Sequence, residues 1–221
     1  MTSNATVLGL RTQTEDALEH LPISGTTEYR KGQIIYGPEY PSNSIYLVVT
    51  GTVGISFVTT DGREVLLDIV PPDELFGESA FLGASRPAER AVAVEATTVM
   101  KWAVADMEDL VAKRPRLAVA LLQILAQRNA ELTRRIESFA HDTVERRLAR
   151  SLIRFSELLG TQEESGTVRM MPFTHEMLSR YVGTSREIVS HYMGRFRSEG
   201  HVSYSRQGIR LRREALKTVL D

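Results

Sequence analysis

Four side chains near the C-terminus have the types and the spacing that can read base pairs. The stretch "VGTSREIVSHYM", from Val182 to Met193, holds a glycine, then small hydroxyl residues, then charged residues at helical spacing. An arginine can bond O6 and N7 of a guanine, and a glutamate accepts a hydrogen bond from N4 of a cytosine. Such residues select a sequence when they open a helix that enters the major groove of DNA. The candidates for reading bases are Arg186, Glu187, Ser190 and His191.

The residues around this stretch predict the elements that hold it. Thr174 is a good N-cap for a helix over "HEMLSRYV", and Gly183 can end that helix in the left-handed conformation. Thr184 and Glu187 have the spacing of a capping box for a second helix. Two short helices joined by a tight glycine turn form a helix-turn-helix. We expect the core face of the second helix to consist of Ile188, Val189, Tyr192 and Phe196.

The segment "HVSYSRQGIRLRR" that follows predicts a hairpin wing with Gly208 at its turn. Contacts to phosphates add affinity without sequence information. We expect them from Thr174, Thr184, Ser185, Arg195 and Arg206, with Arg210, Arg212 and Arg213 as further candidates. The alternative is a capped surface helix that carries charges by chance.

The charge distribution agrees with a polyanion at the C-terminal end only. Residues 1–140 hold 13 Lys and Arg against 18 Asp and Glu, whereas residues 141–221 hold 14 against 10. The composition, 42% hydrophobic and 25% charged, is that of a soluble globular protein. No apolar run approaches the roughly 20 residues that span a bilayer, and the first thirty residues lack a signal-peptide pattern. We expect a cytoplasmic protein without membrane contact.

The chemistry of an enzyme is not apparent. The chain has no cysteine, which argues against disulfides, thiol nucleophiles and an iron–sulfur cluster. The five histidines make no HExxH or HxH pair, so we expect no metal site. No catalytic triad, phosphate-binding Walker loop or carboxylate pair stands out. The sequence therefore favours a binding protein.

The N-terminal half reads as short strands and turns. β-branched and aromatic residues gather in "QIIYG", "SIYLVVTGTVGISFVT", "EVLLDIV" and "TTVMKWAV". Asp61 and Gly62 lie between two such runs and predict a two-residue hairpin turn in which both residues have positive φ. Strands at this spacing predict a small antiparallel barrel or jelly roll.

A long helix is predicted over Arg116–Phe139, which contains neither glycine nor proline. Its length, on the order of 36 Å, exceeds what a small barrel needs as cover. We expect its apolar stripe to pair with a second copy in a two-fold dimer, the alternative being packing on its own barrel alone. Arg128 interrupts the stripe, either to serve a ligand of the barrel or to form an interhelical salt bridge with Glu131 or Glu137. The stripe consists of Leu117, Leu121, Leu125, Leu132, Ile136 and Phe139.

From about Thr27 to Leu220 the chain resembles the Crp/Fnr superfamily of bacterial transcription regulators. The resemblance rests on the glycines of "RKGQIIYGPEYPSNSIYLVVTGTVGI", on "LFGESAFLG" and on "TSREIVSHYMGRF". It implies an α+β protein with a cyclic-nucleotide-binding-type β-roll (a jelly roll), a long dimerisation helix and a C-terminal winged helix-turn-helix. The implied domains are residues 1–115 for the effector, 116–140 for dimerisation and 141–221 for DNA.

The same resemblance implies roles for single residues. Arg186 and Glu187 match the base-reading Arg and Glu of the family, and Ser190 matches a Ser of its oxygen-sensor branch. His191 stands where an Arg is usual, so the bases that it reads stay open. The implied partners are double-stranded DNA, a second copy through the 116–140 helix, and RNA polymerase.

The family's nucleotide site is only partly present. Gly77 and Glu78 match it, but its Arg-Ser pair is absent: a gapless alignment, which we favour, places Pro87-Ala88 there, and a two-residue insertion places Arg90-Ala91 there. Arg128 falls where the cyclic-AMP regulators have an arginine. Cyclic AMP or another small effector stays open, and no cofactor is fixed. The candidates for the effector pocket are Gly77, Glu78, Ser79, Arg86, Arg90, Arg128, Leu132 and Thr133.

The resulting hypothesis is a sequence-specific DNA-binding regulator that acts as a homodimer on a palindromic site under control of an effector in the β-roll. The alternative is a cyclic-nucleotide-binding sensor module whose DNA binding is weak or secondary.

Overall fold

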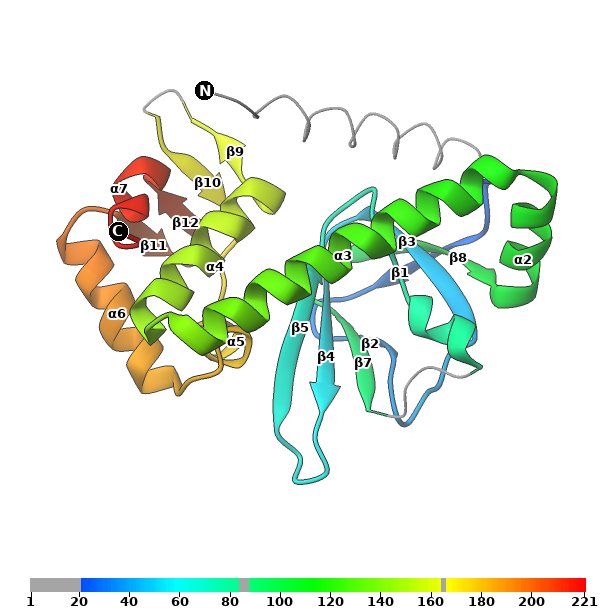
Figure 1. The fold of residues 1–221 in the computed structure, drawn as a ribbon, viewed down its shortest axis with the longest axis horizontal. Coiled ribbons are helices and arrows are strands. Elements are labelled where there is room, and N and C mark those ends of the chain that lie inside the picture. Colours follow the sequence, from blue (N-terminus) through cyan, green and yellow to red (C-terminus); the bar gives the residue numbers. More distant parts are fainter. Residues whose placement is uncertain (1–20, 84–87, 164–165) are drawn as a thin grey trace. The chain divides into compact units, whose positions relative to one another are not determined.

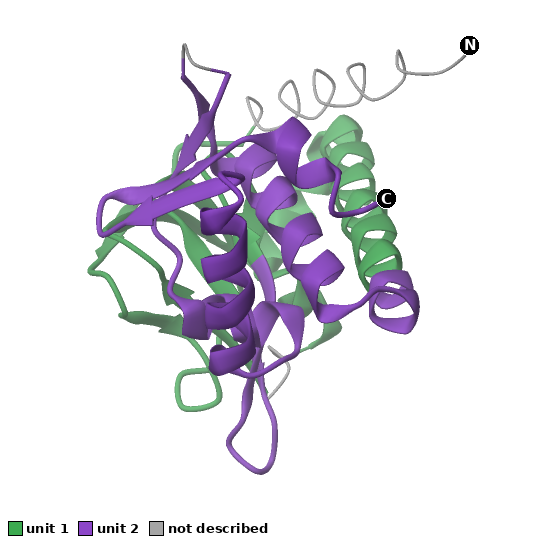
Figure 2. Ribbon diagram, turned by 90° about the vertical axis from the view of Figure 1, so that its left-hand side faces the viewer, with its two compact units in different colours: residues 1–55, 69–135 green, residues 56–68, 136–221 purple. Residues whose placement is uncertain are grey.

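The structure is a computed structural model, and it describes residues 21–83, 88–163 and 166–221. The described residues form two compact units (Figure 2). Unit 1 draws on residues 1–55 and 69–135, and unit 2 on residues 56–68 and 136–221. Antiparallel sheets and helices both contribute, which confirms the predicted α+β class.

The predicted roll of short antiparallel strands is confirmed in the N-terminal half (Figure 1). One four-stranded sheet has the order β1-β8-β3-β6, and the other has the order β2-β7-β4-β5. Most turns between the strands contain a glycine or proline signal of the sequence, whereas the turn between β7 and β8, residues 94–96, contains neither residue. The strands are β1 (Thr26–Tyr29), β2 (Ile34–Tyr36), β3 (Ser44–Thr50), β4 (Val53–Val58), β5 (Glu64–Val70), β6 (Leu75–Phe76), β7 (Glu89–Ala93) and β8 (Thr97–Ala103).

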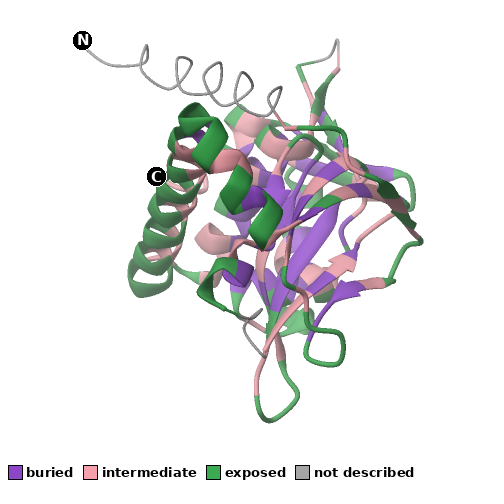
Figure 3. Cartoon of the chain, turned by 90° about the vertical axis from the view of Figure 1, so that its right-hand side faces the viewer, coloured by how far each residue is buried: buried purple, intermediate pink, exposed green. Residues whose placement is uncertain are grey.

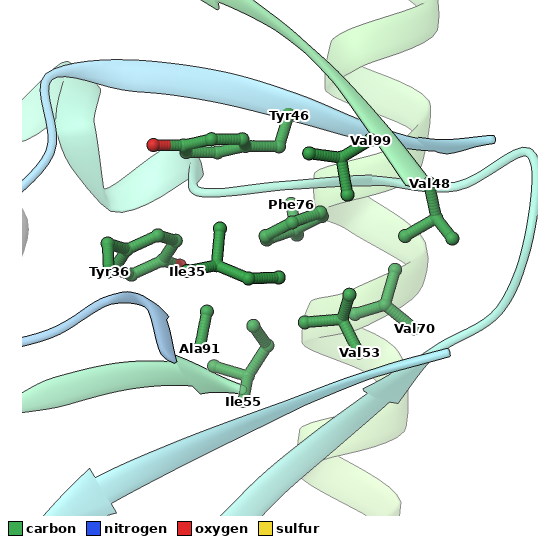
Figure 4. Packing of buried hydrophobic residues seen from close by; sticks show 10 residues of the cluster. All are labelled: Ile35, Tyr36, Tyr46, Val48, Val53, Ile55, Val70, Phe76, Ala91 and Val99. Atoms are coloured by element: carbon green, nitrogen blue, oxygen red, sulfur yellow. The ribbon is translucent and has the colours of Figure 1, made fainter. Parts of the chain in front are cut away.

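Side chains from several strands fill the interior of the roll. Three aromatic rings stack there: the centroid of Tyr46 lies 5.5 Å from that of Tyr36 and 5.0 Å from that of Phe76 (Figure 4). Val48, Val99 and other aliphatic residues surround them. Buried residues concentrate on these strands (Figure 3), as expected where alternate side chains point to one face.

The turn at Asp61 and Gly62 joins β4 to β5, as predicted, but its geometry differs from the prediction. Gly62 has φ 80°, whereas Asp61 does not have a positive φ. The backbone N–H of Thr59 donates to the carbonyl of Arg63 at 2.8 Å, and that of Gly62 donates to the carbonyl of Thr59 at 2.9 Å. The loop is therefore longer than two residues, and one left-handed glycine is enough to reverse the chain.

The long helix is confirmed: α3 runs from Pro115 to His141, after the shorter α2 (Val104–Lys113). Its predicted apolar stripe divides in two. Leu117 is buried and Leu121 packs against the core of unit 1, whereas Leu125 and the later members are exposed. Each step of four residues advances about 40° around a helix, so the stripe moves away from the roll. No helix among the described residues has the length and apolarity needed to cross a membrane.

Unit 2 contains the predicted helix-turn-helix and wing. Its C-terminal part is a four-stranded sheet of order β11-β12-β10-β9 with helices that pack through Leu148, Leu152 and Phe155. The elements are α4 (Val144–Leu159), β9 (Thr161–Gln162), β10 (Val168–Met170), α5 (His175–Val182), α6 (Arg186–Ser198), β11 (Val202–Ser205), β12 (Gly208–Leu211) and α7 (Arg213–Lys217).

Candidate DNA-reading surface and effector pocket

The turn between α5 and α6 is built as the sequence predicts. Thr174 caps α5, since its hydroxyl oxygen accepts a hydrogen bond from the backbone N–H of Met177 at 3.0 Å. Gly183 ends α5 in the left-handed conformation, with φ 72° and ψ 50°. A Cβ at this position would also lie 2.8 Å from the ring of Phe139. The left-handed backbone therefore favours glycine, and the nearby ring adds crowding that any Cβ would have to displace.

The cap of α6 lies one residue later than predicted. Ser185, not Thr184, is the N-cap, and its hydroxyl accepts from the backbone N–H of Ile188 at 3.3 Å. The predicted capping box of Thr184 with Glu187 is therefore wrong, because Ile188 stands three residues after the true cap. Hydrogen bonds from its own backbone N–H and from Ser185 lower the pKa of Glu187. Its carboxylate stays ionised, the form that accepts from a cytosine.

The two faces of α6 separate at helical spacing. Val189, Met193 and Phe196 are buried, whereas Ile188 is exposed over 42% of its surface and Tyr192 is half-buried. The predicted core face is therefore correct for Val189 and Phe196 and wrong for Ile188. Exposed on this helix are all four base-reading candidates, Arg186, Glu187, Ser190 and His191.

Ser190 has a neighbour that sequence reasoning missed. Its hydroxyl donates to the backbone carbonyl of Arg186 at 2.9 Å and lies 2.8 Å from Nδ1 of His175. Burial first, and then the charge of Arg186, lower the pKa of His175, so its ring is neutral at pH 7. The same ring packs edge-on against Tyr204 of β11. His175 thus links the first helix, the second helix and the wing beside the candidate surface.

Two arginines that we expect to contact phosphates, Arg206 and Arg195, are both exposed, but their neighbours differ. Arg206 stands in the turn between β11 and β12. Arg195 forms ion pairs with Glu199 at 2.8 Å and with Glu145 at 3.0 Å, and these two carboxylates raise its pKa. A phosphate would have to compete with both for Arg195. The other candidates are the exposed caps Thr174 and Ser185 and the half-buried Thr184.

Two of the further candidates have partners inside unit 2. Nε of Arg210 lies 3.0 Å from a carboxylate oxygen of Glu163. Arg213 donates from Nε to the hydroxyl of Ser156 at 2.7 Å, and it also donates to the backbone carbonyl of Ser156. These contacts link C-terminal elements of unit 2, and the phosphate contacts expected of both arginines stay predictions.

A tight turn positions the first part of the candidate effector pocket, Gly77 and the two residues after it. Gly77 has φ 86°, and a Cβ there would lie 2.9 Å from the carbonyl oxygen of Ser44. A short 3-10 helix, Glu78–Leu82, follows directly. The first residue of that helix faces α3, and the second, Ser79, is buried.

Arg128 of α3 reaches the roll. It forms an ion pair with Glu78, with 2.5 Å between nitrogen and oxygen, and it also donates to the carbonyl of Leu75. The sequence suggested a ligand of the barrel or an interhelical salt bridge for this arginine, and the ion pair with Glu78, a residue of the roll, is neither of these. Beside the pair is a cavity of about 30 Å³, room for one or two water molecules. Its lining is largely apolar: Ile45, Leu75, Phe76, Phe81, Leu121, Ile124 and Leu125, with Glu78 and Arg128.

Glu89 is a second carboxylate inside the roll, and sequence reasoning missed it. It accepts hydrogen bonds from the hydroxyls of Tyr36 and Ser79, each at 2.8 Å. Burial first, and Glu89 second, raise the pKa of Tyr36, so its phenol stays protonated and donates. The signal lay in the strand alternation, because Glu89 has the same parity on β7 as the buried Ala91 and Ala93.

The remaining effector candidates are not brought to the cavity. Arg90, the next residue on β7, pairs with Glu39 at 3.3 Å. Leu132 and Thr133 are exposed on α3. Across the described ranges no three His, Asp or Glu side chains gather as metal ligands would. Outside the described residues lie Arg86 and Pro87.

The described side chains of the roll do not form the anion site that a cyclic nucleotide needs. A cyclic phosphate carries negative charge and requires N–H donors or a cation. The cation at the cavity, Arg128, is already paired with Glu78, and Glu89 adds a carboxylate beside Ser79.

Two family models match separate parts of the chain. The cyclic nucleotide-binding domain matches residues 26–114, and the Crp-like helix-turn-helix domain matches residues 146–219. The first model covers the roll with its candidate pocket, and the second covers the helix-turn-helix and the wing.

Known regulators are similar over most of their length. The transcriptional regulator SdrP of Thermus thermophilus is 33% identical over 183 residues, 81% of this chain and 86% of its own. A "CRP-like cAMP-activated global transcriptional regulator" of Mycobacterium tuberculosis is 28% identical over 179 residues, 79% of this chain and 78% of its own.

Solved structures of transcription regulators have the same fold as this chain. A CRP/FNR family transcriptional regulator from Thermus thermophilus has a TM-score of 0.66 and 28% identity, covering 88% of this chain and 97% of its own. FixK2 from Bradyrhizobium japonicum shares the fold, with a TM-score of 0.78 and 24% identity over 90% of this chain and 98% of its own. The chain therefore belongs to the CRP/FNR family of transcription regulators, and not to a family of enzymes.

Proposed function

We propose that this chain binds a palindromic DNA site as a homodimer and regulates transcription under the control of an effector in the roll. The observation that carries the DNA part is the exposed start of α6, where Arg186 and Glu187 stand on a glycine turn. The proposed domains are 1–115 for the effector, 116–140 for the dimer and 141–221 for DNA. RNA polymerase is the proposed second partner, and the cytoplasm is the proposed place of action.

Each of the four base-reading candidates on α6 has a proposed role. Arg186 bonds a guanine and Glu187 accepts from a cytosine, because these pairings fit the major-groove edges. Ser190, placed by His175, and His191 read neighbouring bases. Arg206 at the tip of the wing contacts a phosphate. In a two-fold dimer the two α6 helices reach half-sites about 34–36 Å apart, one turn of DNA.

The test is fluorescence anisotropy of a labelled palindromic duplex at fixed salt. Arg186→Ala should lose roughly 1–3 kcal/mol, about 5- to 150-fold, on the specific site and much less on random DNA. Arg134→Ala, on the exposed face of α3, is the matched control and should leave both affinities unchanged. An equal loss on both duplexes would reduce Arg186 to a phosphate contact and refute its role in reading bases.

The effector is proposed to act where α3 meets the roll, through Glu78 and Arg128. One relative is named as cAMP-activated, but the paired Arg128 and the inward Glu89 argue against tight cyclic AMP binding here. The second candidate function, a cyclic-nucleotide sensor with weak DNA binding, is favoured by the match to the cyclic nucleotide-binding domain. Titration calorimetry with cyclic AMP separates the two. One tight site per chain, with weak DNA binding, would support the sensor; no heat up to millimolar nucleotide, with tight DNA binding, supports the regulator.

A further inference from the structure

The exposed face of α3 carries an apolar row beside the face that covers the roll, and the two meet at Leu125, which is 43% exposed and also lines the cavity. Leu117, Leu121 and Ile124 pack against the core of unit 1, and Arg128 continues this side toward Glu78. A second row lies beside these residues, each of its positions one residue later in the helix. We call this row the outer seam. Its apolar members are between 41% and 68% exposed. The outer seam consists of Leu122, Leu125, Asn129, Leu132, Ile136 and Phe139.

The spacing of the outer seam is that of a coiled coil. Successive members are alternately three and four residues apart, so that each pair of steps spans one heptad. Leu122, Asn129 and Ile136 therefore occupy the a positions, and Leu125 and Leu132 are d positions. The interruption of the seam is thus Asn129, because Arg128 belongs to the face that covers the roll.

A polar residue in the middle of this seam indicates what covers it. An asparagine amide that meets an apolar partner loses its hydrogen bonds to water without replacement. Opposite a second copy in parallel register, the two Asn129 amides meet and satisfy each other. Within its own helix, the backbone carbonyl of Asn129 accepts a hydrogen bond from the hydroxyl of Thr133 at 2.9 Å, and Asn129 itself is exposed. The small Ala126, Thr133 and Ala140 flank the seam at the e positions and allow close approach.

We propose that Asn129 pairs with Asn129 of a second copy and fixes a parallel, two-stranded, in-register α3 dimer. This inference rests on the proposed homodimer and names the residue that sets its register. A slip by one heptad would move one α3 along the other by about 10 Å, at 1.5 Å per residue. Such a slip would destroy the two-fold relation that a palindromic site requires. Asn129 thereby couples the helix register to the choice of DNA site.

The absence of cysteine makes a disulfide test clean, because each introduced thiol is the only one in its chain. Leu132→Cys alone should cross-link to itself on oxidation, since facing d positions lie within disulfide reach. Ala130→Cys, exposed beside the seam, is the matched control and should not. If Leu132→Cys cross-links no better than Ala130→Cys and the full chain sediments as a monomer, the proposed homodimer itself fails.

The register is tested by mixing Leu125→Cys and Leu132→Cys chains, allowing exchange, and then oxidising. With Asn129 present, we expect 125–125 and 132–132 products, with the slipped 125–132 product below about a tenth of them. With Asn129→Leu added to both chains, the slipped product or higher oligomers in sedimentation should rise to comparable amounts. If Leu132→Cys cross-links but Asn129→Leu changes neither readout, the dimer stands and the role of Asn129 is refuted.

Discussion

The turn of the helix-turn-helix depends on Gly183, and its substitution by alanine has a predictable cost. Gly183 has φ 72°, and a left-handed alanine costs roughly 1–2 kcal/mol. The added Cβ would also lie 2.8 Å from the ring of Phe139. That ring is 41% exposed and can move, so we place the crowding near the low end of the 1–3 kcal/mol typical of overpacking. The total expected loss of unfolding free energy is about 2–3 kcal/mol.

Gly194, in the middle of α6, is the matched control for Gly183. It has helical backbone, and a Cβ there would meet no heavy atom within 4 Å. Gly194→Ala should therefore raise stability by roughly 0.5–1 kcal/mol, because alanine loses less entropy in a helix. The same change from glycine to alanine is thus expected to lower the unfolding free energy at position 183 and to raise it at position 194.

The assay is urea unfolding with hydrogen exchange read by mass spectrometry on peptides of α5 and α6. This readout follows unit 2 directly and does not assume that both units unfold together. The reasoning would be refuted if Gly183→Ala and Gly194→Ala shifted the midpoint in the same direction. A neutral Gly183→Ala would mean that the turn relaxes into another conformation and that the left-handed glycine does not set the geometry of the helix-turn-helix.

Three further predictions concern single side chains. Arg206→Ala should weaken binding to specific and random DNA alike and reduce the salt slope by about 1, measured by anisotropy across salt concentrations. The pKa of His175 is lowered on folding, so the folded state holds fewer protons and stability should fall as the pH drops through the window just below 6.5. His175→Gln should flatten that loss in thermal unfolding between about pH 7.5 and 5.5, and an unchanged slope would contradict it. Glu89→Gln removes an inward carboxylate and should tighten cyclic AMP binding in calorimetry, whereas Tyr36→Phe, which keeps that charge, should not.

Local signals in the sequence determined much of the architecture. The left-handed glycine at 183, the Thr174 cap and the uninterrupted run of α3 act within one turn or one helix, so they can be read without the fold. The strand texture predicted the roll for the same reason. Where the local rule allowed two solutions, the prediction was wrong: Ser185 stands beside Thr184, and either hydroxyl could have capped α6.

Only the tertiary structure decided which charges meet and which faces are covered. Arg128 pairs with Glu78 fifty residues away, and Glu89 turns toward Tyr36 fifty-three residues away, contacts that no periodicity encodes. The same contacts separate the two rows of α3, which the sequence shows as one stripe with an arginine in it. The physical reason is the separation along the chain over which each kind of interaction acts. Caps, turns and helix periodicity depend on neighbours in the chain, whereas the partner of a charge and the cover of an apolar row depend on which elements the fold brings together.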